Sequence, residues 1–391
     1  MTHNSEPKLT RRSFLANSAK VAAGFTLTQY VPTLYARDCF GHQTTLPDDI
    51  DCALPIGRHW DRSLADVASL DPFIEEPQLA EPAVRERHKI FTLVLMKLVH
   101  RFFNGNKLGP AGEYGQRPKQ RLGALPGKDN RLIGRYQGDH DSKIDWDRYV
   151  GHNIACMAVN GRGEIVDFEF NHNAFFDSSA EHAEARLVRR LYALSHISEY
   201  AKGRIPADDR PILLRDYSIY TSLESCAQCS GIMSLAQVKE VVFLQHDPGQ
   251  FRIGNIMYKL AGKDGQHPLA PLPIPANERL IGLRHLEELD RKYAAFAADQ
   301  KAHRESPFFT APNGGKVFDD QITSFLCTDD ALEIFKAGAG DFDALQGSLN
   351  ASRSRPTGNA ATLTNEECLV QARLFYEYAS KVGMRGSPHE S

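Results

Sequence analysis

Two cysteines three residues apart are the strongest chemical feature of the sequence. Cys226 and Cys229 stand in the stretch SLESCAQCSG, in a chain with seven cysteines. A predicted helix over 226–238 places both thiols on one face of its first turn, where free backbone N–H groups and the helix dipole favour thiolates. Ser225 is expected to cap this helix through its hydroxyl. Two thiolates at one helix start predict one side of a metal site.

A third ligand is available at the start of the preceding predicted helix, over 179–203. His182 lies there with Glu184 beside it, and Ser178 or Ser179 is the expected cap. Both helix starts follow predicted strands, so His182 meets the two cysteines if those strands are neighbours in the sheet. Three protein ligands leave a fourth position open, as in catalytic zinc sites, and Glu184 then serves as a proton carrier that is not a ligand.

Other interpretations of the cysteine pair stay open. A Cys-x-x-Cys motif is also typical of a redox pair, and of one half of a structural zinc knuckle. A structural zinc knuckle would need a second Cys-x-x-Cys motif or a histidine pair at finger spacing, and the sequence has neither. The redox pair leaves His182 and Glu184 without a role. The four residues together favour a catalytic zinc site.

The periodicity of the sequence predicts the elements that position these residues. A core helix starts near Pro82 and stops at Asn104 and Gly105. The order that follows is hairpin, helix, strand, helix, strand, with predicted strands over 152–160, 164–173, 216–223 and 239–247. Further segments are expected as a helix over 253–260, a strand over 269–276 and a helix over 283–300. This order predicts an α/β sandwich whose sheet is covered on both faces.

These motifs carry a resemblance. His-Ala-Glu at 182–184, followed by SLESCAQCSG and by VKEVVF at 238–243, resembles the cytidine deaminase-like superfamily, and especially its branch of tRNA adenosine, guanine and deoxycytidylate deaminases. The signature of these enzymes is His-x-Glu followed by Pro-Cys-x-x-Cys. Ser225 stands where that proline is usual, which marks a divergent member.

The resemblance implies a fold and a site. The fold is a three-layer α/β/α sandwich with a central mixed sheet, extended at both ends of the chain. The site is a Zn²⁺ ion held by His182, Cys226 and Cys229, with Glu184 as the catalytic proton shuttle. Substrate contacts are implied for the following positions: Asn171, with Asn173 as the alternative, and the backbone near Ala183.

The implied function is zinc-dependent hydrolytic deamination of a nucleobase, nucleoside or nucleotide-type amine, with release of ammonia. One alternative is a deaminase acting on adenosine or cytidine in tRNA or single-stranded nucleic acid, with a basic loop tracking the strand. Another is a catalytically inactive zinc-binding module. Glu184 counts against an inactive module, because a structural zinc has no use for a proton carrier. Resembling enzymes often associate, so the resemblance allows an oligomer.

The N-terminus predicts export. Arg11 and Arg12 precede a stretch free of charge that runs from Val21 through Ala36, a pattern typical of a twin-arginine signal. The apolar part is too short and interrupted to anchor the chain in a bilayer. We therefore expect the twin-arginine export machinery to be a partner and the protein to be periplasmic or secreted. This location favours a small-molecule substrate over cytoplasmic tRNA.

Composition sets the remaining limits. The 391 residues, 42 % hydrophobic and 24 % charged, suffice for at least one full core, and the formal net charge of −3 gives no global attraction to a polyanion. The expected organisation is a signal peptide at 1–36, a linker or extension at 37–80, a zinc deaminase domain at 81–304 with a basic loop insertion at 105–149, and a helical C-terminal extension at 305–391.

Overall fold

The centre of the fold is a mixed five-stranded sheet with the strand order β2-β1-β3-β4-β7. The computed structural model describes residues 63–103, 153–173, 178–201, 213–264, 267–302, 320–345 and 362–382. The strands are β1 (Ala155–Val159), β2 (Ile165–Phe170), β3 (Ser218–Thr221), β4 (Glu240–Phe243) and β7 (Leu272–Pro275). β1 runs antiparallel to β2 and β3, whereas β3, β4 and β7 are parallel to one another. The loops that leave the carboxyl ends of β3 and β4 therefore gather at one edge of the sheet.

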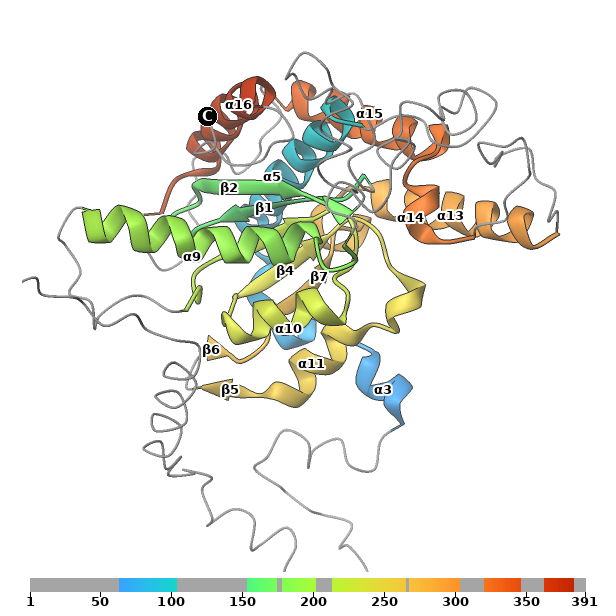
Figure 1. Ribbon diagram of the computed structural model, residues 1–391, viewed down its shortest axis with the longest axis horizontal. Coiled ribbons are helices and arrows are strands. Elements are labelled where there is room, and N and C mark those ends of the chain that lie inside the picture. Colours follow the sequence, from blue (N-terminus) through green and yellow to red (C-terminus); the bar gives the residue numbers. More distant parts are fainter. Residues whose placement is uncertain are drawn as a thin grey trace, which may run out of the picture. The chain divides into compact units, whose positions relative to one another are not determined.

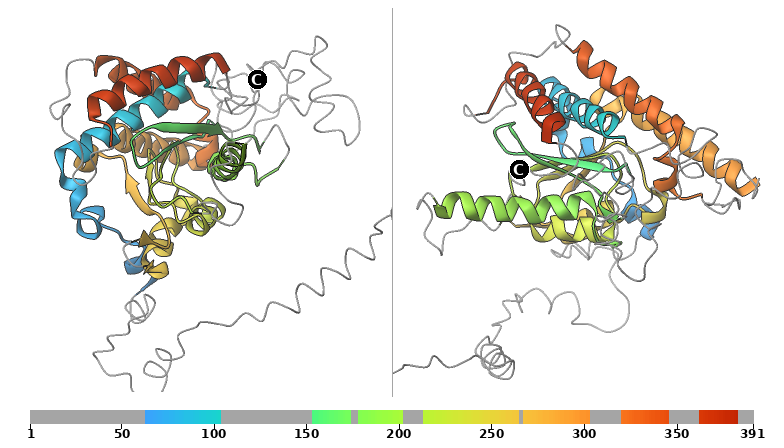
Figure 2. Two further views of the ribbon diagram at one scale, coloured as in Figure 1. Left: turned by 90° about the vertical axis from the view of Figure 1, so that its left-hand side faces the viewer. Right: turned by 45° about the horizontal axis from the view of Figure 1, so that its top comes forward.

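Helices cover both faces of this sheet (Figure 1, Figure 2). One layer consists of α5 (Pro82–Arg101), packed against α15 (Asp329–Ala344) and α16 (Asn365–Val382). The opposite layer contains α9 (Ala183–Ala201) and α10 (Ala227–Leu235), with α11 (Ile253–Ala261) beside α10. The predicted three-layer α/β/α sandwich with a mixed central sheet is confirmed.

Short elements and one 18-residue helix complete the described part of the chain. They are α3 (Leu64–Ala68), α4 (Pro72–Glu75), η2 (Pro77–Ala80), η4 (Pro248–Gln250), β5 (Lys263–Asp264), β6 (His267–Pro268), α12 (Glu278–Ile281), α13 (His285–Ala302) and α14 (Ile322–Phe325). No described helix has the length and apolar character needed to cross a membrane. The predicted signal peptide and the basic loop at 105–149 lie outside the described residues.

Buried charges fix α9 against the edge strand β2. Asp167 and Glu169 are fully buried on β2. The guanidinium of Arg190 donates to Asp167 Oδ1 at 2.6 Å and also pairs with Glu169, and Arg186 Nε lies 3.3 Å from Glu169 Oε1. Buried carboxylates are stable only when they are paired in this way. The network therefore holds the first half of α9 in register with the sheet.

The expected cap of α9 is wrong. Ser178 and Ser179 were expected to start this helix, but it begins at Ala183 and both serines lie before it. The hydroxyl of Ser178 instead accepts from the amide of Ala180 at 3.2 Å. The start of α9 is set by Asn171, whose side-chain oxygen accepts from the amide of Ala183 at 2.7 Å.

The N-terminal extension packs on the sandwich through the three short elements α3, α4 and η2. The side-chain amide of Asn255 on α11 donates to the carbonyl of Ala68 at 2.9 Å, and Lys259 donates to the carbonyl of Ser69. Arg279 lies 3.0 Å from Asp71. Leu79 is buried in the core. Residues 63–80 are thus a fixed part of the folded body.

His88 gives the core a pH dependence. Its Nδ1 is 2.9 Å from the hydroxyl of Tyr220, and its Nε2 has no hydrogen-bond partner among the described residues. Burial lowers the pKa of His88 from 6.5 to about 4. Between these values the unfolded chain binds more protons than the folded protein, so stability falls as pH falls from 6.5 to 4.

We expect His88→Gln to flatten this part of the stability curve. At about 1.4 kcal/mol per pKa unit, the wild type should lose roughly 3 kcal/mol of unfolding free energy across the window. Urea unfolding at a series of pH values measures the slope, with the partly exposed His267→Gln as control. Acid effects on the metal site act on all three proteins alike. Parallel curves for His88→Gln and the wild type would contradict the expectation.

Two glycines of α15 should respond in opposite directions to alanine. A Cβ at Gly338 would lie 3.0 Å from Cβ of Met96 on α5, and closer still to its sulfur and methyl group, whereas a Cβ at Gly340 meets nothing within 4 Å. Met96 is fully buried and cannot move into solvent. Gly340→Ala should raise the unfolding free energy by about 0.5–1 kcal/mol through helix propensity.

Gly338→Ala gains the same propensity but overpacks the contact between α15 and α5, so a net loss of roughly 1 kcal/mol is expected. Denaturant midpoints of the two variants, measured side by side at equal slope, test this difference in sign. Equal shifts would mean that Gly338 is not the point of close approach between the two helices.

Candidate metal centre

The loop between β3 and α10 brings Cys226 and Cys229 to the edge of the sheet. The amide of Ser222 donates to the carbonyl of Ala155 on β1 at 3.0 Å, and the amide of Glu224 donates to the carbonyl of Gln245 after β4 at 2.8 Å. The loop is therefore held from both neighbouring strands. Cys226 is the N-cap residue of α10, and Cys229 lies in its first turn.

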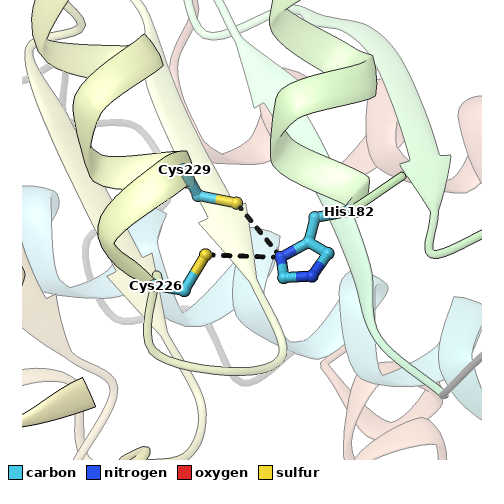
Figure 3. Close-up of side chains that lie close together, drawn as sticks. All are labelled: His182, Cys226 and Cys229. Carbon is cyan, nitrogen blue, oxygen red and sulfur yellow. Dashed lines mark hydrogen bonds between the residues drawn. The ribbon is translucent and has the colours of Figure 1, made fainter. Parts of the chain in front are cut away.

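A second loop brings His182 to the same place. Asn171 follows β2 and fixes the amide of Ala183, and the amide of His172 donates to the carbonyl of Glu181 at 2.9 Å. The residue immediately before α9 is His182, whose carbonyl accepts the first helical bond from Arg186. The imidazole thus projects from the start of α9 toward the start of α10 (Figure 3).

The three side chains converge on one point. Nδ1 of His182 lies 3.3 Å from Sγ of Cys226 and 3.6 Å from Sγ of Cys229. All three donor atoms lie within 4.8 Å of one another. Ordinary Zn–S and Zn–N bonds at a tetrahedral angle separate nitrogen from sulfur by about 3.6 Å. The spacing and the donor types therefore fit zinc, with one coordination position left to a group outside the protein.

Glu184 lies directly behind these ligands. Its carboxyl group is buried, with 3 % of the residue exposed. Oε1 accepts from the hydroxyl of Thr221 at 2.9 Å and lies 3.5 Å from Oγ of Ser225, and Oε2 lies 3.4 Å from Sγ of Cys229. The carboxylate contacts the metal ligands without belonging to the group of three.

The sequence of this region matches a known family. Residues 142–245 match the sequence model of the cytidine and deoxycytidylate deaminase zinc-binding region. This part of the chain is therefore similar to the zinc-binding region of cytidine and deoxycytidylate deaminases. Its cofactor is zinc, since the matched region is the zinc-binding one and the structure assembles a His-Cys-Cys donor set within it.

Comparisons over the whole chain add little to this match. A solved structure from studies of A-to-I editing by tRNA:A34 deaminases at the wobble position of transfer RNA aligns with 37 % of this chain and 86 % of that chain, at 18 % sequence identity and a TM-score of 0.22. No curated protein matches the sequence. The deaminase-like character of the chain therefore rests on the family match and on the donor set.

The thiols of this deaminase-like site differ in protonation. A hydrogen bond from Cys229, together with His182, lowers the pKa of Cys226 to about 4, although burial opposes the shift. The neighbouring Cys226 sulfur and burial raise the pKa of Cys229. One ligand is thus already a thiolate, and the second must lose its proton when a cation binds. Burial also raises the pKa of Glu184.

The structure assembles most of the predicted site. His182, Cys226, Cys229 and Glu184 come together, and Asn171 lies beside them through its bond to Ala183. The amide of Ala183 and the side-chain oxygen of Asn171 are both occupied by that bond. Asn173 has a buried Oδ1 without a partner among the described residues. The substrate contacts predicted for these positions stay predictions.

Two features of the site differ from, or go beyond, the sequence-based expectations. Ser225 does not cap α10, because Cys226 takes the N-cap position without a side-chain hydrogen bond and Ser225 turns toward Glu184 instead. Thr221, which orients the carboxylate of Glu184, was not foreseen. The alternation of side chains along β3 could have indicated it. Thr221 is the last residue of the strand and points to the same face of the sheet as Ile219, two residues earlier.

Proposed function

We propose that this protein is a zinc-dependent hydrolytic deaminase that acts on an amino-bearing nucleobase, nucleoside or nucleotide and releases ammonia. The observation that supports this proposal is the buried carboxylate of Glu184, which touches the metal-ligand cluster without belonging to it. A purely structural zinc site needs no such group. The match of residues 142–245 to the deaminase zinc-binding region agrees with this interpretation.

Glu184 is the proton carrier in the proposed reaction. Zinc, when held by these three residues, supplies a Lewis acid that makes a water molecule acidic near neutral pH. Thr221 holds Oε1 of Glu184 by a hydrogen bond, and Oε2 lies 3.4 Å from Sγ of Cys229, so the carboxyl group is fixed beside the metal ligands, where it would accept a proton from the attacking water. The same carboxyl group would pass this proton to the ring nitrogen. It would then take the remaining proton of the former water from the hydroxyl group at the ring carbon and give it to the amine, which leaves as ammonia while the carbon keeps the oxygen.

A substrate panel tests the proposal. Zinc-loaded protein is incubated with bases, nucleosides, nucleotides and pterins, and the release of ammonia is followed. We expect release from at least one ring class, loss of activity with a chelator, and recovery when zinc is added back. Release only from tRNA or single-stranded oligonucleotides, with binding that falls steeply with salt, would identify a nucleic-acid deaminase instead. No release from any substrate would contradict the proposal.

We also propose that the protein works outside the cytoplasm. Arg11, Arg12 and the uncharged stretch up to Ala36 support export through the twin-arginine pathway. That pathway carries folded proteins, so the thiolate site is filled with metal before it meets an oxidising compartment. Fractionation of cells that express the full chain, compared with an Arg11→Lys, Arg12→Lys variant, tests the location. Retention of both proteins in the cytoplasm would contradict it.

A further inference from the structure

A cavity of about 560 Å³ lies beside the metal centre. Its walls are α3, through Ala65 and Ala68, the first residues of α11, and the loop from His246 to Arg252 that follows β4. Glu224, two residues before the ligand Cys226, also lines it. A volume of this size accommodates a compact ligand of one or two rings.

The loop of this cavity is tied to the helix that carries the thiols. Oε1 of Gln250 accepts from the amide of Ala227, the first residue of α10, at 3.3 Å, and the amide of Asp247 donates to Oε2 of Glu224 at 3.1 Å. The wall of the cavity is therefore held in a fixed position relative to the start of α10, which carries two of the metal ligands.

Two consecutive residues of the loop have left-handed backbone conformations. Phe251 has φ 50° and ψ 33°, and Arg252 has φ 55° and ψ 42°. Such conformations cost residues other than glycine of order 1 kcal/mol or more each, and they gather at functional sites. Here they present the ring of Phe251 to solvent, with 79 % of the residue exposed, at the wall of the cavity.

One cation in the cavity wall, Arg252, interacts with the charges of Glu224 and His246 only at longer range. The guanidinium of exposed Arg252 makes no hydrogen bond or ion pair with any residue that the structure describes. The two carboxylates in the wall accept hydrogen bonds from backbone amides. The carboxylate of Glu224 accepts from the amide of Asp247, and the carboxylate of Asp247 accepts from the amide of Gly249 at 2.9 Å. His246 is held by Asp290, with Nδ1 2.6 Å from Oδ2. Arg252 is thus the cationic side chain of the wall whose hydrogen-bond donors are not used by a described residue, although its charge also acts on Glu224.

The wall formed by α3 limits the shape of the ligand. Asn255 and Lys259 bond to the carbonyls of Ala68 and Ser69 at its C-terminal end. These residues of α3 and α11 lie outside residues 142–245, which match the deaminase family. The wall closes one side of the cavity, which suits a compact molecule better than a continuous strand.

We propose that this cavity is a recognition subsite for a phosphate or carboxylate group that the substrate ring carries, with Arg252 pairing with the anion and Phe251 packing against the apolar part of the ligand. The proposal rests on the proposed deaminase function of the neighbouring metal centre. It narrows the substrate class from any amino-bearing ring to one that also bears an anionic group. A charge-assisted hydrogen bond of this kind corresponds to about tenfold or more in affinity.

Binding of matched ligand pairs tests the subsite without turnover. Calorimetric titration of the zinc-loaded Glu184→Gln protein compares cytidine, adenosine and guanosine with their 5′-monophosphates, and pterin with pterin-6-carboxylate. We expect at least one anionic member to bind about tenfold or more tightly than its neutral partner. A preference for the monophosphates alone would identify phosphate as the anion, and inorganic phosphate should then compete with the monophosphate for binding. A preference for pterin-6-carboxylate alone would identify a carboxylate.

Further substitutions in the Glu184→Gln protein show which residue is responsible for the preference for anionic ligands. Arg252→Gln should abolish it, and Arg252→Lys should retain part of it. Arg101→Gln, an exposed position at the end of α5 in the opposite layer, should leave it intact. Equal binding of all neutral and anionic partners, or a preference that survives Arg252→Gln, would overturn the subsite.

The anion subsite and the deaminase function can be rejected independently of each other. Ammonia release by the wild type from neutral rings only, with no anion preference in binding, would reject the subsite and leave the deaminase intact. An Arg252-dependent preference in a protein that releases ammonia from no ligand would support the subsite and reject the deaminase.

Discussion

Cys229→Ala should abolish stable zinc binding. The wild-type protein is expected to hold about one zinc ion per chain, because Nδ1 of His182 and the two sulfurs lie at distances that suit one tetrahedral ion. Removal of one thiolate leaves two protein ligands, too few for a stable zinc site. Metal analysis of purified protein after gel filtration measures the stoichiometry. Cobalt substitution adds a spectroscopic readout, since thiolate-to-cobalt bands should appear in the wild type and be lost in the variant.

Cys327→Ala is the matched control for this prediction. Cys327 is also a buried cysteine, but it lies just after α14 and is not one of the three clustered donors. This variant should keep both the zinc and the cobalt spectrum. Retention of a full complement of zinc by Cys229→Ala would show that the donor set is not the metal site. The chemistry proposed for Glu184 would then lose its basis.

Glu184→Gln should lower ammonia release by a factor of about 10³ or more while zinc content stays the same. Loss of a positioned general acid and base alone corresponds to about 10²–10⁴ in rate, and here one group serves both steps. Glutamine keeps the size of the side chain and an oxygen that can accept from Thr221 but cannot accept the proton. Steady-state ammonia release on the best substrate of the panel, with zinc content measured on the same sample, tests both parts.

Glu333→Gln provides the comparison for Glu184→Gln. Glu333 is exposed on α15, where it pairs with Lys336 on the surface. This variant should match the wild type in rate and zinc content. If Glu184→Gln kept the wild-type rate, the proton carrier would have to be another group. If it lost zinc, the effect on rate would report on the metal site instead.

The local part of the site could be predicted from the sequence because helix geometry determines it. Cys226 and Cys229 are three residues apart at one helix start, with Cys226 as the N-cap and Cys229 in the first turn, so their thiols are close whatever the rest of the fold. The hairpin and the helices that follow it show periodicities of two and 3.6 residues, which predicted the strands β1 and β2 and the helices α9 and α10. The meeting of His182 with the cysteines was expected only if β2 and β3 were neighbours in the sheet, and this condition is wrong because β1 lies between them. The two helix starts still meet, because β2 and β3 both run antiparallel to β1 and so end at the same edge of the sheet.

The capping serines show where local reasoning fails. Ser178, Ser179 and Ser225 are of the right type to cap helices, but capping depends on which backbone amides are left free in the folded chain. Asn171 fixes the amide of Ala183 and so determines where α9 starts. Ser225 lies near Glu184, which is 41 positions away along the chain. No local pattern carries that information.

The sequence by itself determined the chemistry of the metal centre, since the donor types and their spacing along the chain are local properties. Only the tertiary structure decided how Glu184 is oriented and what surrounds the centre. The cavity wall depends on a bond between Asn255 and Ala68, which are 187 positions apart, and on the left-handed backbone of Phe251 and Arg252. Contacts over such separations arise from the packing of whole elements, and so they leave no pattern in any short stretch of sequence.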